Sequence, residues 1–490
     1  MRKTKIVATI GPACESEEML EQMIKHGLNT ARLNMSHGCH EEHKIKIDRI
    51  MKLNEKLGSN VAIMLDTKGP EIRLGDFKEG KVLLVEGKNI KLVTDKIEGT
   101  EQEVHITYQN ITRDVTVGTE ILLNDGAVSL TVVEIGENFV NCRINNTGLI
   151  KSRRGVNIPK TKITLPSLTD IDKADIAFGI ENGVDYIAAS FIRKKEDVED
   201  IKEYLKSLNA ENVKIISKIE SDEGIQNFDE ILEVSDGIMV ARGDMGVEVP
   251  IDTLPGIQKK MIKKTIEKGK LVITATQMLE SMISCPKPTR AEVSDVANAI
   301  YDSTSAIMLS GETASGNYPI ECIDMMSSIA ETTESQIDYW NRFKKRNVDK
   351  MGAYVTPKEE YFSSETAKLR KQINFSVCSS ALFVDAKAII AVSENGKTPA
   401  VLSGFRPGCP IYVFSANPKT CNQLNLEWGI KAIYIEGERD YHQMLQKGID
   451  ILVKEGSLKK DDVVILGSGA TPHKEGNNIS MQTMGALIRI

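Results

Sequence analysis

Residues 237–244 read GIMVARGD, a short apolar run that becomes polar at its end. Seven other stretches in the first two thirds of the chain have the same form. They begin at Lys5, Thr30, Val61, Tyr186, Lys214, Leu271 and Ser305. A short run that is apolar throughout is typical of a strand buried on both faces, as in a parallel sheet. The pattern therefore predicts eight parallel strands.

Amphipathic segments separate most of these strands. In SEEMLEQMIKHG (16–27), apolar residues return every three to four positions, which is the period of a helix. Successive strands lie about 30 residues apart, the size of a βαβ unit. Eight such units predict an α/β fold of the (β/α)₈ TIM barrel type, in which functional residues stand at the C-terminal ends of the strands.

One gap breaks this rhythm, between the third strand and the fourth. Residues 70–166 alternate short strands with turn signals, such as the hairpin-like Asn124-Asp125-Gly126 and Glu86-Gly87. We therefore predict a small all-β lid domain at 70–166. It is inserted above the mouth of a catalytic barrel formed by 1–69 and 167–342.

The chain beyond the barrel has a different organisation. A charged, helix-poor stretch is expected from Arg342 to about Thr366. Short apolar strands then alternate with helical segments again. We therefore expect residues 343–490 to form a second, open α/β domain.

The composition argues against several classes of protein. The net charge of −7 and the pI of about 5.7 give no global basic field, so neither nucleic acid nor a membrane is an expected partner. The eight cysteines form no CxxC pair or framework spacing, which is typical of reduced thiols in the cytosol. The sequence has no apolar core of a signal peptide and no stretch of roughly 20 apolar residues. We expect a cytoplasmic protein.

Polar side chains at the ends of the predicted strands are the candidates for a functional site. They include Arg32, Asn34, Ser36, His37, Asp66, Thr67, Arg73, Lys218, Glu220, Arg242, Asp244, Thr276 and Ser310. Glu220 and Asp244 end adjacent strands, and two carboxylates at one barrel mouth suit Mg²⁺ or Mn²⁺. The alternative is that each carboxylate caps a helix or pairs with a neighbouring arginine.

The cations of this rim indicate an anionic substrate. Lys218 and Glu220 are two positions apart on one strand, so their side chains point to the same side. A lysine there can neutralise a phosphoryl group or an enolate oxygen, although a buried structural salt bridge is the alternative. Arg32 and Arg73 supply fork-shaped donors that suit a phosphate.

Two further groups of rim residues indicate binding sites less strongly. Oxygen atoms of Asn34, Ser36, Asp66 and Thr67 come from two strand ends and could seat a monovalent cation. The turn at 242–246 (RGDMG) leaves backbone N–H groups open, which suits a carboxylate or a phosphate. The alternative is that these glycines only allow a tight turn and bind nothing.

Longer strings at these positions resemble the signature blocks of the pyruvate kinase family. They are ARLNMSHG (31–38), LDTKGPEIR (65–73), SKIES (217–221), MVARGDMGVEVP (239–250), ITATQMLESMI (273–283), PTRAEVSDVANA (288–299) and MLSGETASGNYP (308–319). The resemblance runs from Thr4 through the barrel and lid, and more loosely to the C-terminus. It implies transfer of the phosphoryl group of phosphoenolpyruvate to ADP, giving pyruvate and ATP, with Mg²⁺ or Mn²⁺ and usually K⁺.

The resemblance also implies roles for individual residues. Glu220 and Asp244 would hold the divalent metal, and Lys218 would meet the phosphoryl group in transfer. The N–H groups of Gly243 and Asp244, with the Thr276 hydroxyl, would receive the substrate carboxylate. The enolate carbon would then be protonated through water.

Further residues are implied around that water, the nucleotide and K⁺. The water would lie near Thr276 and Ser310, and Arg32 would lie near the phosphate with Arg73. The K⁺ site would consist of Asn34, Ser36, Asp66 and Thr67. The nucleotide side would consist of Asn34, His37, Arg73 and Arg154, with Asp125 near it. Glu71 follows the KGP string, which in this family accompanies K⁺ dependence.

The C-terminal region resembles the family less closely. SENGKT (393–398) resembles an effector phosphate loop, and its candidate contacts are Ser393, Asn395, Gly396, Lys397 and Thr398. An ordinary strand-to-helix turn is the alternative. The loop GSGATPHKEGNNISMQ (467–482) departs from the usual family string, so fructose 1,6-bisphosphate, another sugar phosphate and AMP all remain open as effectors. The family implies an allosteric homotetramer.

Two other functions are open to the sequence. Another barrel enzyme of enolate chemistry would explain the two carboxylates, but not the lid or the phosphate-side arginines. A non-catalytic metabolite sensor would use residues 393–398 while the barrel is inert. The presence of Lys218, Glu220, Asp244 and Thr276 argues against such a sensor.

Overall fold

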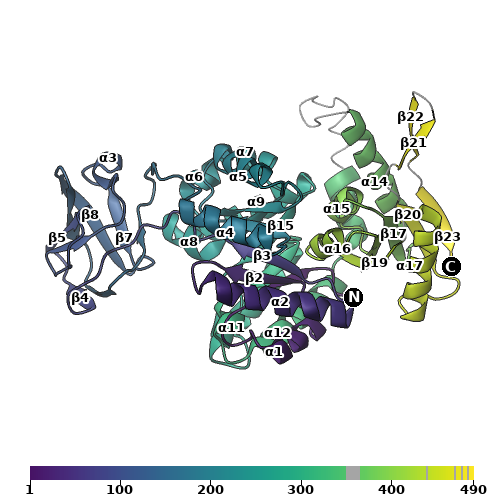
Figure 1. Ribbon diagram of the computed structural model, residues 1–490, viewed down its shortest axis with the longest axis horizontal. Helices are drawn as coiled ribbons and strands as arrows, with labels where there is room; N and C mark the ends of the chain where they lie inside the picture. Colours follow the sequence, from purple (N-terminus) through teal and green to yellow (C-terminus); the bar gives the residue numbers. More distant parts are fainter. Residues whose placement is uncertain (349–364, 438–439, 468–470, 476–477, 483–484) are drawn as a thin grey trace.

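The computed structural model describes residues 1–348, 365–437, 440–467, 471–475, 478–482 and 485–490. Three units lie in a row, with a small β unit at one end, a barrel in the middle and an α/β unit at the other end (Figure 1). Within the described ranges, none of the helices has both the length and the apolar character that a bilayer crossing requires.

The eight predicted barrel strands are all present. They are β1 (Lys5–Thr9), β2 (Thr30–Asn34), β3 (Ala62–Asp66), β12 (Tyr186–Ala189), β13 (Lys214–Ile219), β14 (Gly237–Ala241), β15 (Leu271–Ala275) and β16 (Ala306–Leu309). They close in the order β1-β16-β15-β14-β13-β12-β3-β2, with every pair parallel. The predicted (β/α)₈ barrel is therefore confirmed.

Helices cover the outside of the barrel. The longer ones are α1 (Glu17–Lys25), α2 (His40–Leu57), α4 (Asp170–Glu181), α5 (Lys195–Ser207), α7 (Phe228–Val234), α9 (Leu254–Glu267), α10 (Arg290–Tyr301) and α12 (Pro319–Ser335). Short helices follow several strands, namely α6 (Asp222–Gln226), α8 (Arg242–Glu248), η1 (Ile251–Thr253), η2 (Glu280–Ile283) and α11 (Gly311–Ala314). Alternate strand residues pack inward and outward, which gives one core inside the barrel and a larger one between strands and helices.

The β unit lies between β3 and α4. Its strands are β4 (Lys81–Leu84), β5 (Asn89–Val93), β6 (Glu103–His105), β7 (Glu120–Leu123), β8 (Val128–Ile135), β9 (Phe139–Ile144), β10 (Gly148–Lys151) and β11 (Val156–Asn157), with the short helix α3 (Ile111–Asp114). Six of them form a sheet in the order β11-β7-β8-β9-β5-β6, and β10 pairs with β4. An all-β insertion is thus present where the sequence predicted one.

Of the two hairpin turns predicted in this unit, one is present and the other is not. Asn124, Asp125 and Gly126 all have positive φ angles, and they join the antiparallel pair β7 and β8. The hairpin-like reading of Glu86-Gly87 is wrong, because β4 pairs with β10 while β5 pairs with β9 and β6. The Gly87 N–H instead donates to the Ile144 carbonyl, so this turn moves the chain between two sheets.

The C-terminal unit is the predicted open α/β sheet. Its strands are β17 (Ala388–Val392), β18 (Ile411–Ser415), β19 (Ile430–Tyr434), β20 (Val463–Gly467) and β23 (Gly485–Arg489), in the order β19-β18-β17-β20-β23. Its helices are α14 (Glu365–Phe383), α15 (Lys397–Phe405), α16 (Pro418–Leu424) and α17 (Tyr441–Lys454), and β21 (Thr471–Glu475) pairs with β22 (Asn478–Gln482). Four strands are parallel, and β23 is an antiparallel edge.

The connection into this unit is more helical than predicted. Helix α13 (Tyr339–Phe343) runs directly into a π-helical segment, η3 (Lys344–Val348). Lys344 and Lys345 are exposed, whereas Arg342 and Arg346 are partly buried. The remainder of the predicted helix-poor stretch, 349–364, lies outside the described residues.

The C-terminal unit contacts the barrel at the ends where the strands begin. The Lys5 Nζ, on β1, donates to the Ile430 carbonyl at 2.5 Å. The Tyr186 hydroxyl, on β12, donates to the Gln423 carbonyl at 2.6 Å. The opposite, C-terminal rim of the barrel therefore faces the β unit, as Figure 1 shows.

Candidate active site

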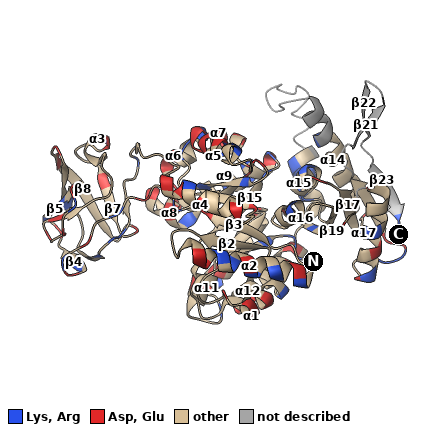
Figure 2. Cartoon of the chain, viewed as in Figure 1, with Lys and Arg blue, Asp and Glu red and all other residues tan. Residues whose placement is uncertain are grey.

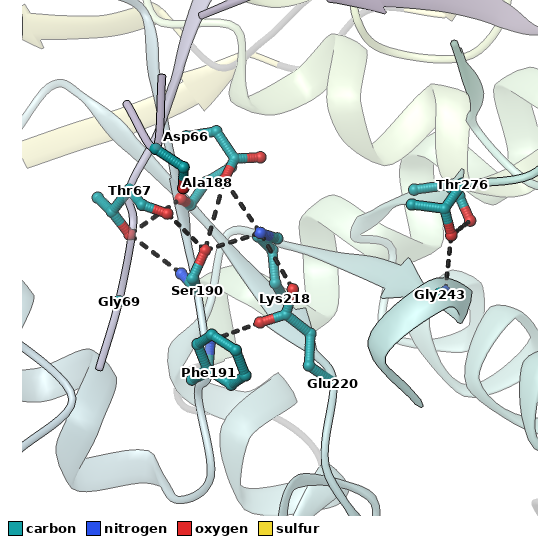
Figure 3. A network of polar contacts seen from close by, with 12 residues as sticks. Asp66, Thr67, Gly69, Ala188, Ser190, Phe191, Lys218, Glu220, Gly243 and Thr276 are labelled. Carbon is teal, nitrogen blue, oxygen red and sulfur yellow. Dashed lines mark hydrogen bonds and ion pairs between the residues drawn. The ribbon is translucent and has the colours of Figure 1, made fainter. Parts of the chain in front are cut away.

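Lys218 is the centre of a buried polar network at this rim (Figure 3). Its Nζ lies 3.0 Å from Asp66 Oδ1, 3.0 Å from Glu220 Oε1 and 2.7 Å from Ser190 Oγ. Burial alone would lower the pKa of Lys218, but the carboxylates of Asp66 and Glu220 raise it above its ordinary value. The lysine is therefore a permanent positive charge at the mouth of the barrel.

Arg32 adds a second cation to the same network. Its Nε donates to Asp66 Oδ2 at 2.6 Å, and its Nη1 donates to the Thr9 hydroxyl at 2.9 Å. Burial would raise the pKa of Asp66, but Arg32 and Lys218 together hold it below its usual range. Because one side of Arg32 is already committed to Asp66, only the rest of its guanidinium fork is available to a phosphate.

Ser190 is a network member that the sequence reasoning missed. Its hydroxyl accepts from Lys218 and donates to the Thr67 carbonyl at 2.6 Å. It directly follows β12, one of two barrel strands, with β1, whose polar ends were left out of the candidate set. Including the tail of every predicted strand would have found it.

Glu220 and Asp244 form the predicted pair of carboxylates. Burial and the charge of Asp244 raise the pKa of Glu220 to about 7, although Lys218 opposes this. Burial likewise raises the pKa of Asp244. The N–H of Phe191 donates to Glu220 Oε2 at 2.6 Å, which fixes the carboxylate at the rim.

The donor set of this pair fits a hard divalent cation. Two carboxylates that repel each other across a small space gain from a cation that both contact. Within the described residues, no group of three or more His, Cys, Asp and Glu side chains could hold a metal. Mg²⁺ needs only one or two carboxylates when water and substrate oxygens complete its shell.

Thr276 stands on a strained turn after β15. Thr276 and Gln277 have φ angles of 67° and 54°, a region that non-glycine residues rarely adopt. The guanidinium of Arg242 donates to the Thr276 carbonyl at 2.5 Å and is itself held by Asp295 at 2.6 Å. Arg242, which the sequence placed on the rim without a role, thus stabilises the strained turn.

The predicted carboxylate cradle is more closed than expected. The Gly243 N–H, counted as an open donor, already donates to the Thr276 hydroxyl at 2.8 Å (Figure 3). The hydroxyl in turn donates to the Ala275 carbonyl at 2.7 Å. A ligand would have to replace the first of these bonds. The cause is local: α8 begins so close to β15 that its first N–H groups meet the side chain of Thr276.

Ser310 follows the last barrel strand, β16. Its Oγ is buried and, among the described residues, has no hydrogen-bond partner. The backbone around it is fixed by the buried Glu312, which accepts from the Ser310 N–H at 2.7 Å and from the Leu279 N–H at 3.2 Å. An unpartnered hydroxyl at the rim is available to a substrate or a water.

The residues proposed for a monovalent cation lie at the ends of two paired strands. Asn34 on β2 and Asp66 on β3 are direct register partners. The Asn34 side chain accepts the Ser36 N–H at 3.2 Å, and the Thr67 hydroxyl accepts the Ser190 N–H at 3.1 Å. Asn34 and Asp66 therefore lie at the ends of adjacent strands, although both carboxylate oxygens of Asp66 already contact Arg32 and Lys218.

A cavity of about 500 Å³ opens between the rim and the β unit. Of the predicted residues, Arg73, Asp125, Arg154 and Asp244 line it. Arg73 is held by Glu71, with Nε and Oε2 2.7 Å apart. The proposed nucleotide set is therefore divided, because Asn34 and His37 are not among the lining residues.

The predicted effector loop is a strand-to-helix turn. It follows β17 and enters α15 through Gly396, whose φ angle is 72°. The Ser393 hydroxyl accepts the Gly396 N–H at 3.1 Å, and the Asn395 side chain accepts the Lys397 N–H at 3.2 Å. Lys397 is exposed, whereas Thr398 is buried. Of the 467–482 loop, residues 471–475 and 478–482 form the antiparallel pair β21 and β22, and residues 468–470 and 476–477 lie outside the described residues.

The fold and rim together define a (β/α)₈ barrel with a buried lysine and buried carboxylates at the strand ends, where barrel enzymes carry their active sites. The model of the pyruvate kinase barrel domain matches residues 1–323, and that of the pyruvate kinase alpha/beta domain matches residues 371–481. The chain therefore belongs to the pyruvate kinase family, whose members are phosphotransferases.

Individual relatives agree with this assignment. A pyruvate kinase of Staphylococcus haemolyticus is 47% identical over 484 residues, which span 98% of this chain and 80% of the relative. A pyruvate kinase of Staphylococcus aureus strain MRSA252 is 44% identical over the same shares. The crystal structure of a pyruvate kinase from Cryptosporidium parvum superposes with a TM-score of 0.90 at 36% identity and covers 100% of this chain and 96% of that one.

Proposed function

We propose that this chain transfers the phosphoryl group of phosphoenolpyruvate to ADP, giving pyruvate and ATP, in the last step of glycolysis. Membership of the pyruvate kinase family supports the reaction class. The single observation that carries the proposal is the buried Lys218, held between two carboxylates where a phosphoryl group would pass. Phosphoryl transfer depends on positioning and charge neutralisation rather than on a protein nucleophile.

The proposed division of the chain follows the sequence. Residues 1–69 and 167–342 form the catalytic barrel, 70–166 the lid and 343–490 the regulatory unit. The cavity between the lid and the rim supports this arrangement, because it lets the lid cover the reacting groups and exclude water.

Glu220 and Asp244 are the proposed ligands of Mg²⁺ or Mn²⁺. When bound, such an ion would neutralise phosphoryl and carboxylate oxygens of the substrate. The protein's own contribution is to hold the two carboxylates: Glu220 is fixed by the Phe191 N–H, and Asp244 lies on the first turn of α8. The raised pKa values of both carboxyls are consistent with a place for a cation.

The remaining catalytic roles are proposals of the same kind. Lys218, with Arg32 and Arg73, neutralises the phosphoryl group, and Lys218 then stabilises the enolate oxygen. Gly243, Asp244 and Thr276 receive the substrate carboxylate once the bond between Gly243 and Thr276 opens. The hydroxyls of Thr276 and Ser310 position the water that protonates the enolate carbon.

The nucleotide and the monovalent cation are placed at two sides of the rim. Arg73 and Arg154 meet ADP from the lid cavity, and Asn34 and His37 approach it from the end of β2. K⁺ is held by Asn34, Ser36, Asp66 and Thr67, and Ser190 connects this group to Lys218 as a positioning residue.

Regulation is the least direct part of the proposal. Residues 393–398 are the proposed site of a sugar-phosphate or nucleotide activator, supported by the helix start at Lys397 and its left-handed Gly396. A cytoplasmic homotetramer is the proposed assembly, on the pattern of the family.

A coupled assay of pyruvate release tests the proposed reaction. The purified chain is given phosphoenolpyruvate and Mg²⁺, with and without ADP, and with and without K⁺. We expect pyruvate and ATP to form in equal amounts, in an ADP-dependent and K⁺-stimulated reaction. Pyruvate formation that does not require ADP would favour another enolate-forming enzyme, and absence of turnover would favour a sensor.

A further inference from the structure

Three arginines converge at the base of the barrel, on the side away from the proposed active site. The turn between α10 and β16 contains Ser303, whose hydroxyl accepts from Arg342 Nη1 at 3.1 Å and from Arg346 Nη2 at 2.8 Å. Arg406 Nη2 donates to the Ser303 carbonyl at 3.1 Å. The arginines come from α13, from η3 and from the residue that ends α15.

These three charges have no counter-charge in contact. Among the described residues, no carboxylate lies within ion-pair distance of Arg342, Arg346 or Arg406. Asp302, the nearest acid in sequence to Ser303, is instead held by Lys259 at 2.7 Å. Asp302 and Glu267 act on Arg346, and Glu427 acts on Arg406, through longer-range electrostatic attraction.

The cluster is also short of hydrogen-bond acceptors. Arg346 Nη1 and Arg406 Nε are buried and have no partner in the described part of the chain. Burial lowers the pKa of Arg346 to about 10 and that of Arg406 to about 9. Arg342 and Arg346 share one neutral hydroxyl, and Arg406 bonds only to uncharged oxygens of Ser303, Ser305 and Ser403. Buried charges are costly unless they are paired, so the arrangement lacks a counter-charge.

We propose that Arg342, Arg346 and Arg406 form a binding site for a phosphate-type oxyanion, separate from both the barrel rim and residues 393–398. Guanidinium forks bind tetrahedral oxyanions through paired, charge-assisted hydrogen bonds. A doubly charged phosphate also suits three positive charges better than a single carboxylate does. Inorganic phosphate and the phosphate group of a metabolite share this chemistry.

The two more accessible arginines make room for the anion. The void beside Arg342 and Arg406, which Glu334 also lines, is too narrow for an anion as the side chains stand. Arg406 is fixed by the Ser403 carbonyl at 2.7 Å and by the face of Trp428, 5.0 Å away. Arg342 and Arg346 are only partly buried, so they swing outward and the anion replaces the Ser303 hydroxyl as their shared acceptor.

The anion would join two units of the molecule. Ser303 belongs to the barrel, whereas Arg406 belongs to the C-terminal α/β unit. An oxyanion held by arginines from both sides adds charge-assisted bonds across this contact. Its binding therefore stabilises the docked arrangement of the two units.

Thermal unfolding in matched salts tests the site. The wild type, Arg346→Gln and the control Lys345→Gln are titrated with sodium phosphate or with glycerol 3-phosphate against sodium chloride of equal ionic strength. We expect a saturable rise in apparent Tm for the wild type and the control, and at least a tenfold weaker apparent affinity for Arg346→Gln. Lys345 is an exposed neighbour on η3 and controls for the loss of one charge.

The variants separate this site from other phosphate sites. Lys397→Gln should keep the phosphate-dependent rise, and Arg342→Gln should weaken it as Arg346→Gln does. A crystal grown with sulfate should show the anion within hydrogen-bond distance of Arg346 Nη1 and Arg406 Nε. A phosphate-dependent rise that is absent in the wild type, or unchanged in both arginine variants, overturns the proposal. The stronger of the two titrants identifies the source of the phosphate group.

Discussion

At the scale of single residues, the side chains of the site are held in place by the ion pairs and hydrogen bonds of each charged group. Lys218 divides its three contacts among Asp66, Glu220 and Ser190, so it cannot rotate away from the rim without leaving Glu220 without a cation. Sequence spacing was enough to predict that Lys218 and Glu220 share a side of their strand. It could not predict that Arg32 would turn to Asp66, because that pairing depends on the register between β2 and β3.

Replacing the central lysine tests its role most directly. Lys218→Met should lower kcat by about 10²–10³, because it removes a preorganised charge from the transition state. Binding of phosphoenolpyruvate, followed by protein fluorescence, should remain measurable. Lys195→Met, on the exposed start of α5, is the control and should leave kcat unchanged. An unaltered kcat in Lys218→Met would remove the lysine from the mechanism.

Ser190 should act through its neighbours rather than on the substrate. Ser190→Ala removes the bond to Lys218 and the bond to the Thr67 carbonyl, so we expect kcat to fall about tenfold with little change in KM. The K⁺ concentration for half-maximal activity should rise as well. Ser217→Ala is the matched control, since Ser217 precedes Lys218 on β13 but bonds to Ser235, away from the network. A change in KM alone would contradict the positioning role.

Glu71 decides the expected dependence on K⁺. Its carboxylate holds Arg73 at 2.7 Å, so part of the positive charge of Arg73 is already neutralised by the protein. Turnover in buffer free of Na⁺ and K⁺ should be at least about tenfold lower than with K⁺, and Glu71→Lys should reduce this difference. Appreciable wild-type turnover without either ion would count against the proposal.

At the scale of elements, the barrel strands were the easiest part to predict. Each is apolar throughout and then polar, a pattern that a strand buried on both faces requires. The lid was harder, since its strands pair with partners distant in sequence. Glu86-Gly87 has the composition of a hairpin turn, but β4 and β5 belong to different sheets. Local residues cannot reveal a pairing that is decided by the later strands β9 and β10.

One contact between the lid and the barrel should respond to pH. Asn157 on β11 donates to Glu248 on α8 at 3.1 Å, and burial raises the pKa of Glu248 from its ordinary value to about 7. A carboxyl with a raised pKa in the folded state stabilises the protein while it is protonated. That stability is present below about pH 4.5 and is lost as the pH rises through 7.

Replacing this carboxyl should remove the pH dependence. Glu248→Gln keeps a donor and an acceptor for Asn157 but carries no charge. We expect its apparent Tm to exceed that of the wild type by about 1–2 °C at pH 8, and by less at pH 5.5. Glu223→Gln, which lines the same cavity, is the control. A constant difference between the two pH values would show that ionisation of Glu248 is not involved.

At the scale of the whole molecule, the barrel separates two kinds of site. The β unit covers the C-terminal rim, and the C-terminal unit contacts the opposite end (Figure 1). Charged side chains of both signs are spread over the helices of the barrel (Figure 2), in keeping with the absence of a net basic field in the sequence. The sequence predicted the three units and a lid above the barrel mouth, but not how the C-terminal unit docks. Docking depends on contacts such as that between Lys5 and Ile430, which have no local signature.

The proposed effector loop can be tested without touching the barrel. Lys397→Gln should raise the concentration of a phosphorylated activator needed for half-maximal stimulation by about tenfold or more, because it removes a charge-assisted bond. Activity without the activator should not change. Lys387→Gln, exposed before β17, is the control. Equal stimulation of both variants by fructose 1,6-bisphosphate, AMP and other sugar phosphates would exclude this loop.

The way in which the lid is attached has a consequence for the history of the fold. The chain enters and leaves the lid side by side, with the Val156 N–H donating to the Ile72 carbonyl. The barrel strands on either side, β3 and β12, pair directly with each other. The barrel therefore closes without any contribution from the inserted residues. An inserted domain of this kind can be exchanged between relatives, or lengthened and shortened, while the barrel keeps its architecture.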